Sequence, residues 1–429
     1  MERQAPKQLD YSDVLPIAIN SKSQRREFYP EGGAEYGPAG SAKPNIVRIP
    51  ISAASMLDAQ GSYLKYDIKN TGGIPNDVTI GLDFPQSIFK RLRILSGSGA
   101  VLEDIQNYNR LYAGVLYPIQ AGVGFLHENS ITSGQTLNTT HNTVADFTAG
   151  TSQTHSIHLC SGLLNSEKYL PLALCNSGLI LELEIDNPGS IGVSSAANPT
   201  WEISNFRYVA HLIDLDRGFY ERLRMVMEGS GGVLAIAGTT FKHFSGAWPA
   251  AEVNNTINIP ARLKSIKSIF FKNTIEADVT GHQKFGVSDG VTHGLKSYQF
   301  RVGSVAYPPN AVQVSATNKG EAYQEIRKSM GTLGDYSHGG VLMSSGSLYS
   351  DATTGSATEE TARIGPYALD LESFPRTSLE SGISTSERAL GITLDLTASS
   401  EDISTTVDVW CMCDAIFYVN LDGSMSVSV

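Results

Sequence analysis

Apolar and polar residues alternate strictly along several segments of this chain. Between Leu181 and Asp186 three aliphatic residues alternate with three acidic ones, and the same period of two recurs in 63–69 and 392–397. A period of two places the apolar side chains on one face of a β-strand and the polar ones on the other. Such segments are typical of antiparallel strands that are buried on one face, so we expect an all-β protein. The predicted core residues are Leu64, Tyr66, Ile68, Ile94, Leu183 and Ile185 in the first half of the chain and Ile259, Phe300, Val302, Leu394 and Leu396 in the second.

Three segments have apolar residues at helical spacing instead. The first, 103–117, stops before Pro118, and the second, 217–228, follows Asp216, a residue suited to cap a helix. The third is 321–330, which stops at a glycine. We therefore expect a few short helices among many strands.

The second half of the chain repeats the elements of the first half in the same order. The strand around Ile49 recurs around Ile259, Arg93 recurs as Arg301, and the other matched landmarks also lie 206 to 215 residues apart. Two all-β copies of about 200 residues each suggest two tandem eight-stranded jelly rolls, a sandwich typical of viral capsid and lectin domains. The predicted units are an N-terminal arm (1–44), a first jelly roll (45–215), a linker helix (216–232) and a second jelly roll (233–429).

The N-terminal segment 1–44 has no evident counterpart in the second half. It mixes positive and negative charges and contains several prolines and glycines, so we expect an extended arm rather than a helix. Its SKSQRR run from Ser21 carries three positive charges, enough for a weak, salt-sensitive contact with phosphate. We expect the removal of residues 1–28 to leave the folded protein nearly unchanged.

Each half also carries a long polar loop at the corresponding place, 129–156 in the first half and 335–360 in the second. Loops longer than about 12 to 15 residues are uncommon in compact domains and tend to be functional or disordered. Their Ser, Thr, Gly and Asn content suits a solvated backbone, so we expect both loops on the outer surface of any assembly.

Composition excludes two classes of protein. Charged residues make up 17% of the chain and hydrophobic residues 41%, which excludes disorder over most of its length. The net charge of −11 argues against a chain whose main task is to bind nucleic acid. No run approaches the roughly 18 apolar residues of a membrane span, and the first residues lack the apolar core of a secretion signal, so we expect synthesis in the cytosol.

The candidate metal ligands each have a simpler interpretation. His155 and His158 are three residues apart near a strand, so their rings should point to opposite faces, and we interpret both as polar residues at the end of a loop. Asp216, which with Asp214 forms a DxD motif, is explained as a helix cap. The four cysteines are too few and too scattered for a disulfide framework, so we expect reduced thiols. We expect Cys411 and Cys413 to share one strand face and to pack in the core.

Catalytic signatures are also missing from the sequence. Glu182, Glu184 and Asp186 share one strand face, which favours a solvated or intersubunit surface over a general acid pair. The segment GVTHGLKS from Gly290 lacks the Gly-Lys-Ser/Thr order of a phosphate-binding loop. We therefore expect no catalytic residue, no cofactor and no metal site.

Five segments together resemble the major capsid proteins of double jelly-roll DNA viruses, most closely those of polinton-like viruses and virophages. These segments are GSYLKYDI, FKRLRILSGSGAVLEDIQNYNRLY, SGLLNSEKYLPLAL, LILELEI and FRYVAHLIDLD. The resemblance covers residues 45–429 and rests on the order and spacing of the segments. It implies a homotrimer that forms a pseudo-hexameric capsomer, many copies of which tile an icosahedral shell around a DNA genome. It also implies assembly inside the host cell, a place in the virion, and contacts with neighbouring capsomers, penton proteins and minor capsid proteins. The arm would run beneath the capsomer toward one of these partners, an internal membrane or the packaged DNA.

Two other functions fit a pair of β-sandwiches. A carbohydrate-binding or cupin-like protein would need clustered histidines and carboxylates, or aromatic residues grouped on one face. The nine histidines are dispersed, and Trp201, Trp248 and Trp410 are far apart in the sequence. A viral spike or receptor-binding protein would usually lack the tandem repeat. The sequence therefore favours a structural protein that acts by self-association over an enzyme.

Overall fold

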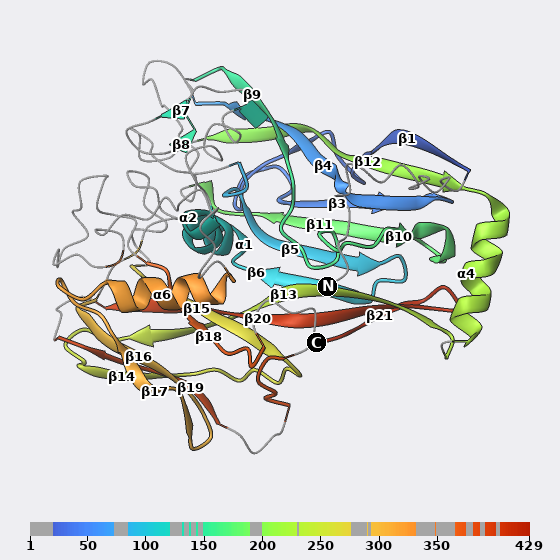
Figure 1. Cartoon of the computed structure of the whole chain (residues 1–429). Coiled ribbons are helices and arrows are strands. Elements are labelled where there is room, and N and C mark those ends of the chain that lie inside the picture. The colour runs from blue at the N-terminus through green and yellow to red at the C-terminus, as the bar shows by residue number, and fades with distance from the viewer. Residues whose placement is uncertain are drawn as a thin grey trace, which may run out of the picture.

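The structure is a computed structural model in which most of the chain forms β-sheets. It describes residues 20–72, 85–120, 131–132, 137–138, 143–144, 149–188, 200–229, 231–275, 290, 293–331, 348, 365–374, 381–386, 391–399 and 404–429. The described strands form four larger sheets and one two-stranded ribbon, β7 (Leu137–Asn138) with β8 (Thr143–Val144). Figure 1 shows the four larger sheets as successive layers.

The first sandwich contains two of these sheets. One sheet has the strand order β1-β12-β4-β10, with β2 beside β12 and β9 beside β4, and the other has the order β3-β11-β5-β6. The strands are β1 (Ser21–Phe28), β2 (Glu35–Tyr36), β3 (Ile46–Ile51), β4 (Met56–Asn70), β5 (Phe89–Ser96), β6 (Val101–Gln106), β9 (Ser152–Ile157), β10 (Leu170–Pro171), β11 (Leu179–Ile185) and β12 (Trp201–Leu215). All of their pairings are antiparallel.

The second sandwich repeats this arrangement. One sheet has the order β13-β20-β15-β18, with β21 beside β20, and the other has the order β14-β19-β16-β17. The strands are β13 (Val233–Trp248), β14 (Asn254–Asn258), β15 (Ile266–Thr274), β16 (Leu295–Val302), β17 (Val305–Gln313), β18 (Tyr367–Asp370), β19 (Ile392–Ala398), β20 (Thr405–Asn420) and β21 (Met425–Ser428). Matching the two orders pairs β1 with β13, β3 with β14, β4 with β15, β5 with β16, β6 with β17, β10 with β18, β11 with β19 and β12 with β20. The prediction of two tandem jelly rolls is confirmed.

The match corrects the expectation for the N-terminal segment. Residues 21–28 were expected to belong to an arm without a counterpart, but they form β1, which pairs with β12 over its full length and corresponds to β13. The alternation rule missed β1 because six of its eight residues are exposed at the edge of the sheet. We therefore propose that the first domain begins at residue 20 rather than at residue 45.

The helices agree with the sequence in two places and differ in one. Helix α4 (Arg217–Gly229) and helix α6 (Gly320–Ser329) lie where the spacing predicts them. The predicted helix 103–117 is wrong at both ends, because β6 occupies its first residues and the helical turns α1 (Tyr108–Leu111), η2 (Tyr112–Leu116) and α2 (Tyr117–Gln120) continue through Pro118. One further short helix is η3 (Leu172–Leu174). Among the described residues no helix is long and apolar enough to cross a membrane.

All eleven predicted core residues are buried, with exposed fractions between 0 and 7%. Cys411 and Cys413 are also buried on the same face of β20, in the core of the second sandwich, as expected. None of the four cysteines forms a disulfide. The period of two therefore located the interior of both sandwiches correctly.

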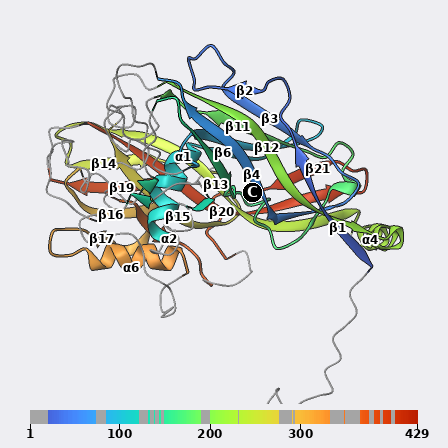
Figure 2. The ribbon, with the colours of Figure 1, turned by 90° about the horizontal axis from the view of Figure 1, so that it is seen from above.

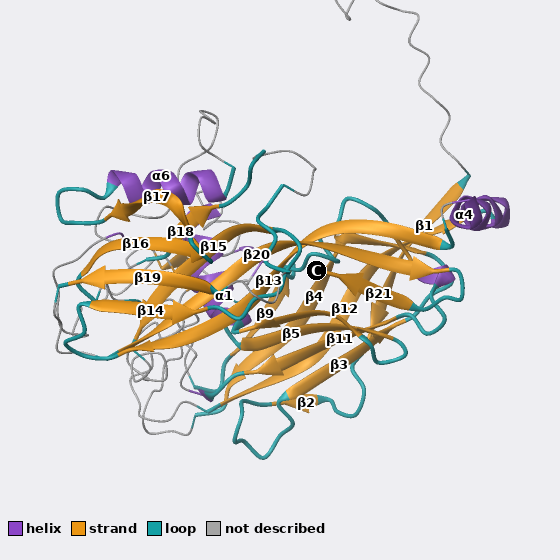
Figure 3. Ribbon diagram, turned by 90° about the horizontal axis from the view of Figure 1, so that it is seen from below, coloured by secondary structure: helices purple, strands orange, loops and turns teal. Residues whose placement is uncertain are grey.

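The two sandwiches lie side by side in the views of Figures 2 and 3. Helix α4 links them at one end of the molecule, and α6 covers the second sandwich at the other. Strand β6 of the first sandwich contacts β13 and β21 of the second. Residues of both halves of the chain therefore build this junction.

Most of the two predicted outer loops lies outside the described residues. Of 129–156, the described part includes β7, β8 and most of β9, so the end of that segment is a strand rather than a loop. Of 335–360, the structure describes only Leu348, which is buried. The placement of these loops on an outer surface stays a prediction.

Candidate functional site: the junction between the sandwiches

Glu103 is a buried carboxylate that joins the two sandwiches. It lies on β6 with 1% of its surface exposed and accepts hydrogen bonds from the Ser161 hydroxyl and from the N–H groups of Gly162 (2.8 Å) and Leu163 (3.4 Å). It also accepts a hydrogen bond from Thr240 Oγ1 on β13, at 2.7 Å. Donors from both sandwiches therefore satisfy one carboxylate, which offsets the cost of burying its charge.

A second polar cluster surrounds Asp408, which is 1% exposed on β20. Arg110 on α1 donates to Asp408 Oδ2 at 3.0 Å, and His243 Nε2 on β13 lies 2.8 Å from Asp408 Oδ1. The side-chain amide of Asn107 lies 3.2 Å from the same histidine nitrogen. Burial alone would raise the pKa of Asp408, but the hydrogen bond from His243 and the charge of Arg110 together hold that pKa below its ordinary value. Asp408 therefore stays ionised and ties α1 to the second sandwich.

The backbones of the two sandwiches also touch directly. A Cβ atom on Gly162 would lie 2.6 Å from the carbonyl oxygen of Thr239, and a Cβ atom on Gly238 would overlap the carbonyl oxygen of Gly162. The approach is possible only because both positions lack a side chain. A rigid contact of this kind fixes how the two sandwiches sit against each other.

Apolar packing is continuous across the junction. The hydrophobic core of the first sandwich extends without a break into side chains of the second. The residues that the second half of the chain contributes to this shared core are Ile236, Phe241, Phe270, Ile326, Leu348, Ala368, Trp410, Ala415, Phe417, Val419 and Met425. The sheet that contains β13, β20 and β15 is therefore buried on both faces, against the second sandwich on one side and the first on the other. Such an interface resembles a domain core, and we expect the two sandwiches to unfold together.

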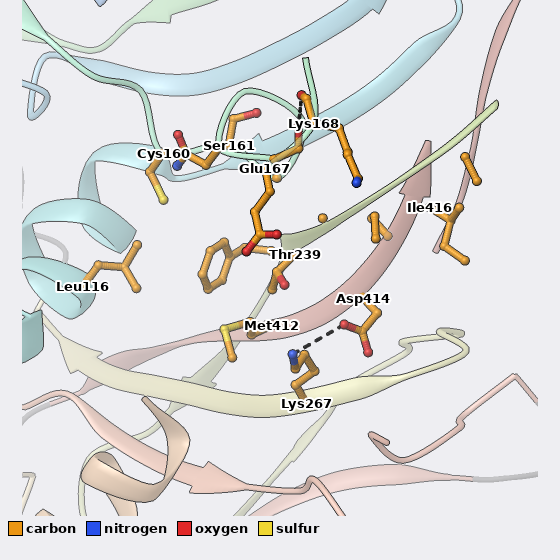
Figure 4. A pocket seen from close by; sticks show the side chains of 18 of the residues that line it. Leu116, Cys160, Ser161, Glu167, Lys168, Thr239, Lys267, Met412, Asp414 and Ile416 are labelled. Atoms are coloured by element: carbon orange, nitrogen blue, oxygen red, sulfur yellow. Dashed lines mark hydrogen bonds and ion pairs between the residues drawn. The ribbon is translucent and has the colours of Figure 1, made fainter. Parts of the chain in front are cut away.

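A cavity of about 750 Å³ opens at the same junction. Figure 4 shows Leu116 and Met412 on its wall and the ion pair between Lys267 and Asp414, whose charged atoms are 3.6 Å apart. Lys267 also pairs with Glu372 at 3.1 Å. Burial and the nearby charge of Glu103 raise the pKa of the Cys160 thiol, which also lines the cavity, to about 12. A thiol with that pKa is protonated at neutral pH and is a poor nucleophile.

The two candidate histidines lie on opposite faces, as the spacing predicts. His155 points inward from β9, is completely buried and stacks near Tyr66, with 5.3 Å between the ring centroids. It was expected to be a polar residue at a loop end, and that expectation is wrong. His158 is exposed and lies near Tyr63. The described residues contain no group of three or more His, Cys, Asp or Glu side chains that could hold a metal ion.

The acidic candidates have separate structural partners. Glu182 lies between Arg48 (3.2 Å) and Arg93 (2.7 Å) on the two neighbouring strands. Asp186 was expected on the same exposed strand face as Glu182, and that expectation is wrong. Asp186 follows the end of β11, is buried and accepts a hydrogen bond from the Asn109 amide at 2.7 Å.

The two aspartates of the DxD motif are likewise accounted for. Asp214 accepts hydrogen bonds from Ser55 (2.6 Å) and Gln24 (2.9 Å), while Asp216 directly precedes α4. These contacts bind strands and a helix together and assemble no reactive pair of groups.

Sequence reasoning missed the residues that make the junction. Glu103 and Arg110 are far in the chain from His243 and Asp408, and a single sequence gives no signal that brings the two pairs together. One local signal was present, because Glu103 is an acid on the inward face of a strand next to apolar Leu102 and Ile105.

The comparisons with known proteins find likeness in structure only. No protein-family model matches the chain, and no curated protein matches it in sequence. Among solved structures, the capsid of the virus PBCV-1 is similar with a TM-score of 0.62 and 14% identity, covering 98% of this chain and 99% of that one. The major capsid protein of Faustovirus (TM-score 0.59, 8% identity) covers 95% of this chain and 92% of its own. The major capsid protein of mavirus (TM-score 0.54, 10% identity) covers 100% and 93%. The chain therefore shares the double jelly-roll fold of these proteins.

Proposed function

We propose that this chain, which has the double jelly-roll fold of viral major capsid proteins, is itself the major capsid protein of a DNA virus. Its work is structural: three copies form a pseudo-hexameric capsomer, and capsomers tile an icosahedral shell around the genome. The protein is then assembled inside the host cell and resides in the virion.

The observation that carries this proposal is the repetition of one strand order in two sandwiches that share a core. A chain of this kind is a rigid unit with two similar halves. Three such units present six similar halves around a three-fold axis, so a trimer can occupy a position with six neighbours in a shell. This symmetry suits a protein that tiles a shell.

The proposed partners follow from a place in the shell. They are neighbouring capsomers, penton proteins and minor capsid proteins. The N-terminal residues up to 19 lie outside the described residues, and the exposed residues Lys22, Arg25 and Arg26 follow them on β1. We propose that this end of the chain makes a non-specific, salt-sensitive contact with packaged DNA or an internal membrane.

A carbohydrate-binding or cupin-like protein remains the second candidate. A cupin-type site needs histidines and carboxylates that converge inside one sandwich. In the parts of the chain that the structure describes, His155 is buried without such partners and no metal-binding group is found. The junction, by contrast, employs its charged residues to hold two sandwiches together, which favours the capsid role and gives no support to catalysis.

Sedimentation velocity of the purified protein at micromolar concentration tests the proposal. One chain has a mass of 46.1 kDa, so a homotrimer should sediment as a particle of about 138 kDa. Obligate interfaces commonly bury roughly 2,000 Å² or more, and such a trimer should survive dilution. A monomer that persists at these concentrations would count against the capsid role.

A further inference from the structure

The contact between the two sandwiches joins two different sides of the jelly roll. The first sandwich contributes the side that carries β6, and the second contributes the side that carries β13. The counterpart of β6 in the second sandwich is β17, and the counterpart of β13 in the first is β1. Each sandwich therefore has one side that contacts the other sandwich, carrying β6 or β13. Each also has a side, carrying β1 or β17, that corresponds to the contacting side of the other sandwich.

The counterpart strands differ in burial. Strands β6 and β13 are covered where the two sandwiches meet, whereas β17 and β1 have no such cover in the part of the chain that the structure describes. Three of the six residues of β6 are buried, but only one of the nine residues of β17 is. On the other side, six of the eight residues of β1 are exposed, against four of the sixteen residues of β13. The β17 side and the β1 side are thus exposed versions of surfaces that the chain buries elsewhere.

The strand registers identify the residues at the centre of each exposed side. Arg93 and Arg301 occupy matching positions, so Ile94, which follows Arg93, corresponds to Val302, which follows Arg301. Ile94 pairs with Glu103, and Val302 pairs with Val305. Val305 is therefore the counterpart of Glu103. Val305 is 52% exposed, whereas Glu103 is buried against the second sandwich.

The strand registers also align β1 of the first sandwich with β13 of the second. Strand β1 begins opposite the last residue of β12, and β13 begins opposite the last residue of β20. Counted from these starts, Tyr29 occupies the place of Phe241, one residue after the Thr240 that donates to Glu103. Phe241 is 7% exposed in the shared core, whereas Tyr29 is 59% exposed.

We propose that the β17 side of one copy of this chain docks on the β1 side of a second copy, with Val305 packed against Tyr29. The contact repeats between chains the arrangement that Glu103, Thr240 and Phe241 make within the chain. The inference rests on the proposed function, because it names the surfaces through which the copies of the capsomer meet. The two docking surfaces differ, so the contact is head-to-tail and leads to a closed ring when the rotation between copies closes.

The chemistry of both sides suits docking through side chains. Pro308 and Pro309 interrupt β17 and have no N–H to donate, so this edge cannot be extended by another strand. The register of β16 with β17 also shifts at this point, so residues 308–311 have no strand-pairing partner on β16, and the Gln299 side chain instead donates to the carbonyl oxygens of Pro308 (2.7 Å) and Pro309 (3.1 Å). The Tyr29 hydroxyl donates to Glu27 at 2.9 Å, and Glu27 pairs with Arg25 at 3.6 Å. The Arg25 guanidinium in turn lies over the ring of Tyr63 at 5.7 Å, which adds a flat, partly apolar surface on this side. Strands β6 and β13 likewise meet within the chain without pairing as neighbours in a sheet.

Two single substitutions test the two sides separately. Val305→Arg and Tyr29→Arg each place a charge at a position that is exposed in one copy, so both variants should keep the melting temperature of the folded chain. Each should weaken the association between copies at least about tenfold, as measured by sedimentation across a dilution series. The matched control is Ile46→Arg, at an aliphatic residue that is 47% exposed on the edge strand β3, and it should leave the association unchanged.

Mixing the two variants tests the head-to-tail geometry. The Val305→Arg chain keeps an intact β1 side, and the Tyr29→Arg chain keeps an intact β17 side, so the mixture should form a dimer of one chain of each kind that neither variant forms alone. If the unmodified protein associates and both variants associate as strongly as it does, this inference is overturned and the proposed function still stands. Variants that dissociate but form no mixed dimer would overturn the head-to-tail contact. An unmodified protein that stays monomeric would instead contradict the proposed function itself.

Discussion

Gly162 and Gly238 lie backbone against backbone where the first sandwich meets the second. A Cβ atom on Gly238 would overlap the carbonyl oxygen of Gly162, and a Cβ atom on Gly162 would lie 2.6 Å from the carbonyl oxygen of Thr239, the residue after Gly238. Gly162 belongs to the segment whose neighbouring N–H groups bind Glu103, and Gly238 lies on β13 two residues before Thr240. The closest approach of the two halves and their buried carboxylate therefore form one contact.

Alanine at either glycine should destabilise the protein. The added methyl group meets backbone atoms, which cannot move aside as a side chain would, so we expect a loss of about 1–3 kcal/mol in the free energy of unfolding for Gly162→Ala and for Gly238→Ala. Gly229→Ala is the control, because no atom lies within 4 Å of the Cβ position there. Urea denaturation measures all three variants. Equal stability of Gly238→Ala and Gly229→Ala would show that the junction is looser than described.

Removal of a single hydrogen bond at Glu103 should also be measurable. Thr240→Val keeps the shape of the side chain but removes the hydroxyl that donates to Glu103 at 2.7 Å, and we expect a cost of about 1–3 kcal/mol. Thr256→Val removes a similar bond to Asp395 on the exposed surface of β14 and should cost less than about 1 kcal/mol. Chemical denaturation compares the two. If both substitutions cost the same, the junction would not be the dry, buried contact that its hydrogen bonds indicate.

Buried His155 should make the stability depend on pH in mildly acidic solution. Burial lowers the pKa of His155 from about 6.5 to about 3, against a small opposing effect of Asp67. The unfolded chain therefore binds a proton below pH 6.5 that the folded chain does not, so stability is complete above that pH and falls as the pH decreases toward 3. The loss should be about 2 kcal/mol at pH 5.

The substitution His155→Phe should remove that part of the pH dependence, because phenylalanine can keep the ring contact with Tyr66 and does not titrate. His158→Gln, three residues away and exposed, should leave it unchanged. Denaturation midpoints between pH 4.5 and pH 7.5 give the comparison. A slope that persists in His155→Phe would assign the pH dependence to other groups.

Truncation separates the strand β1 from the residues before it. Deletion of residues 1–28 removes a strand that pairs with β12 at all eight positions, and we expect the melting temperature to fall by roughly 5 °C or more. Deletion of residues 1–19, which keeps β1, should leave the melting temperature nearly unchanged. An unaffected melting temperature after the longer deletion would restore the view of residues 21–28 as a dispensable arm.

The sequence predicted the parts of the fold that depend on local alternation. In β4, β11 and β19 every second residue enters a core, so Leu64, Leu183 and Leu394 could be assigned without knowledge of their partners. Strand β1 could not be found in this way, because an exposed edge strand has no apolar face to reveal it. In β6, Leu102 and Ile105 are three residues apart, a spacing that fits a helix as well as a strand.

The junction could not be predicted for a different reason. Glu103, Thr240 and Asp408 come together only after both sandwiches have formed, and each residue taken alone is an ordinary polar residue in a β-rich segment. The repeat in the sequence predicted two similar halves, but it did not predict which sides of the two sandwiches are in contact. Val305 and Tyr29 became informative only when the strand registers identified their counterparts.

Cryo-electron microscopy of the purified, unmodified protein tests the proposed capsomer most directly. We predict three-fold particles in which six similar sandwiches surround the axis, with the β17 side of each chain against the β1 side of the next. Particles without three-fold symmetry, or a trimer in which Val305 and Tyr29 both face solvent, would contradict it.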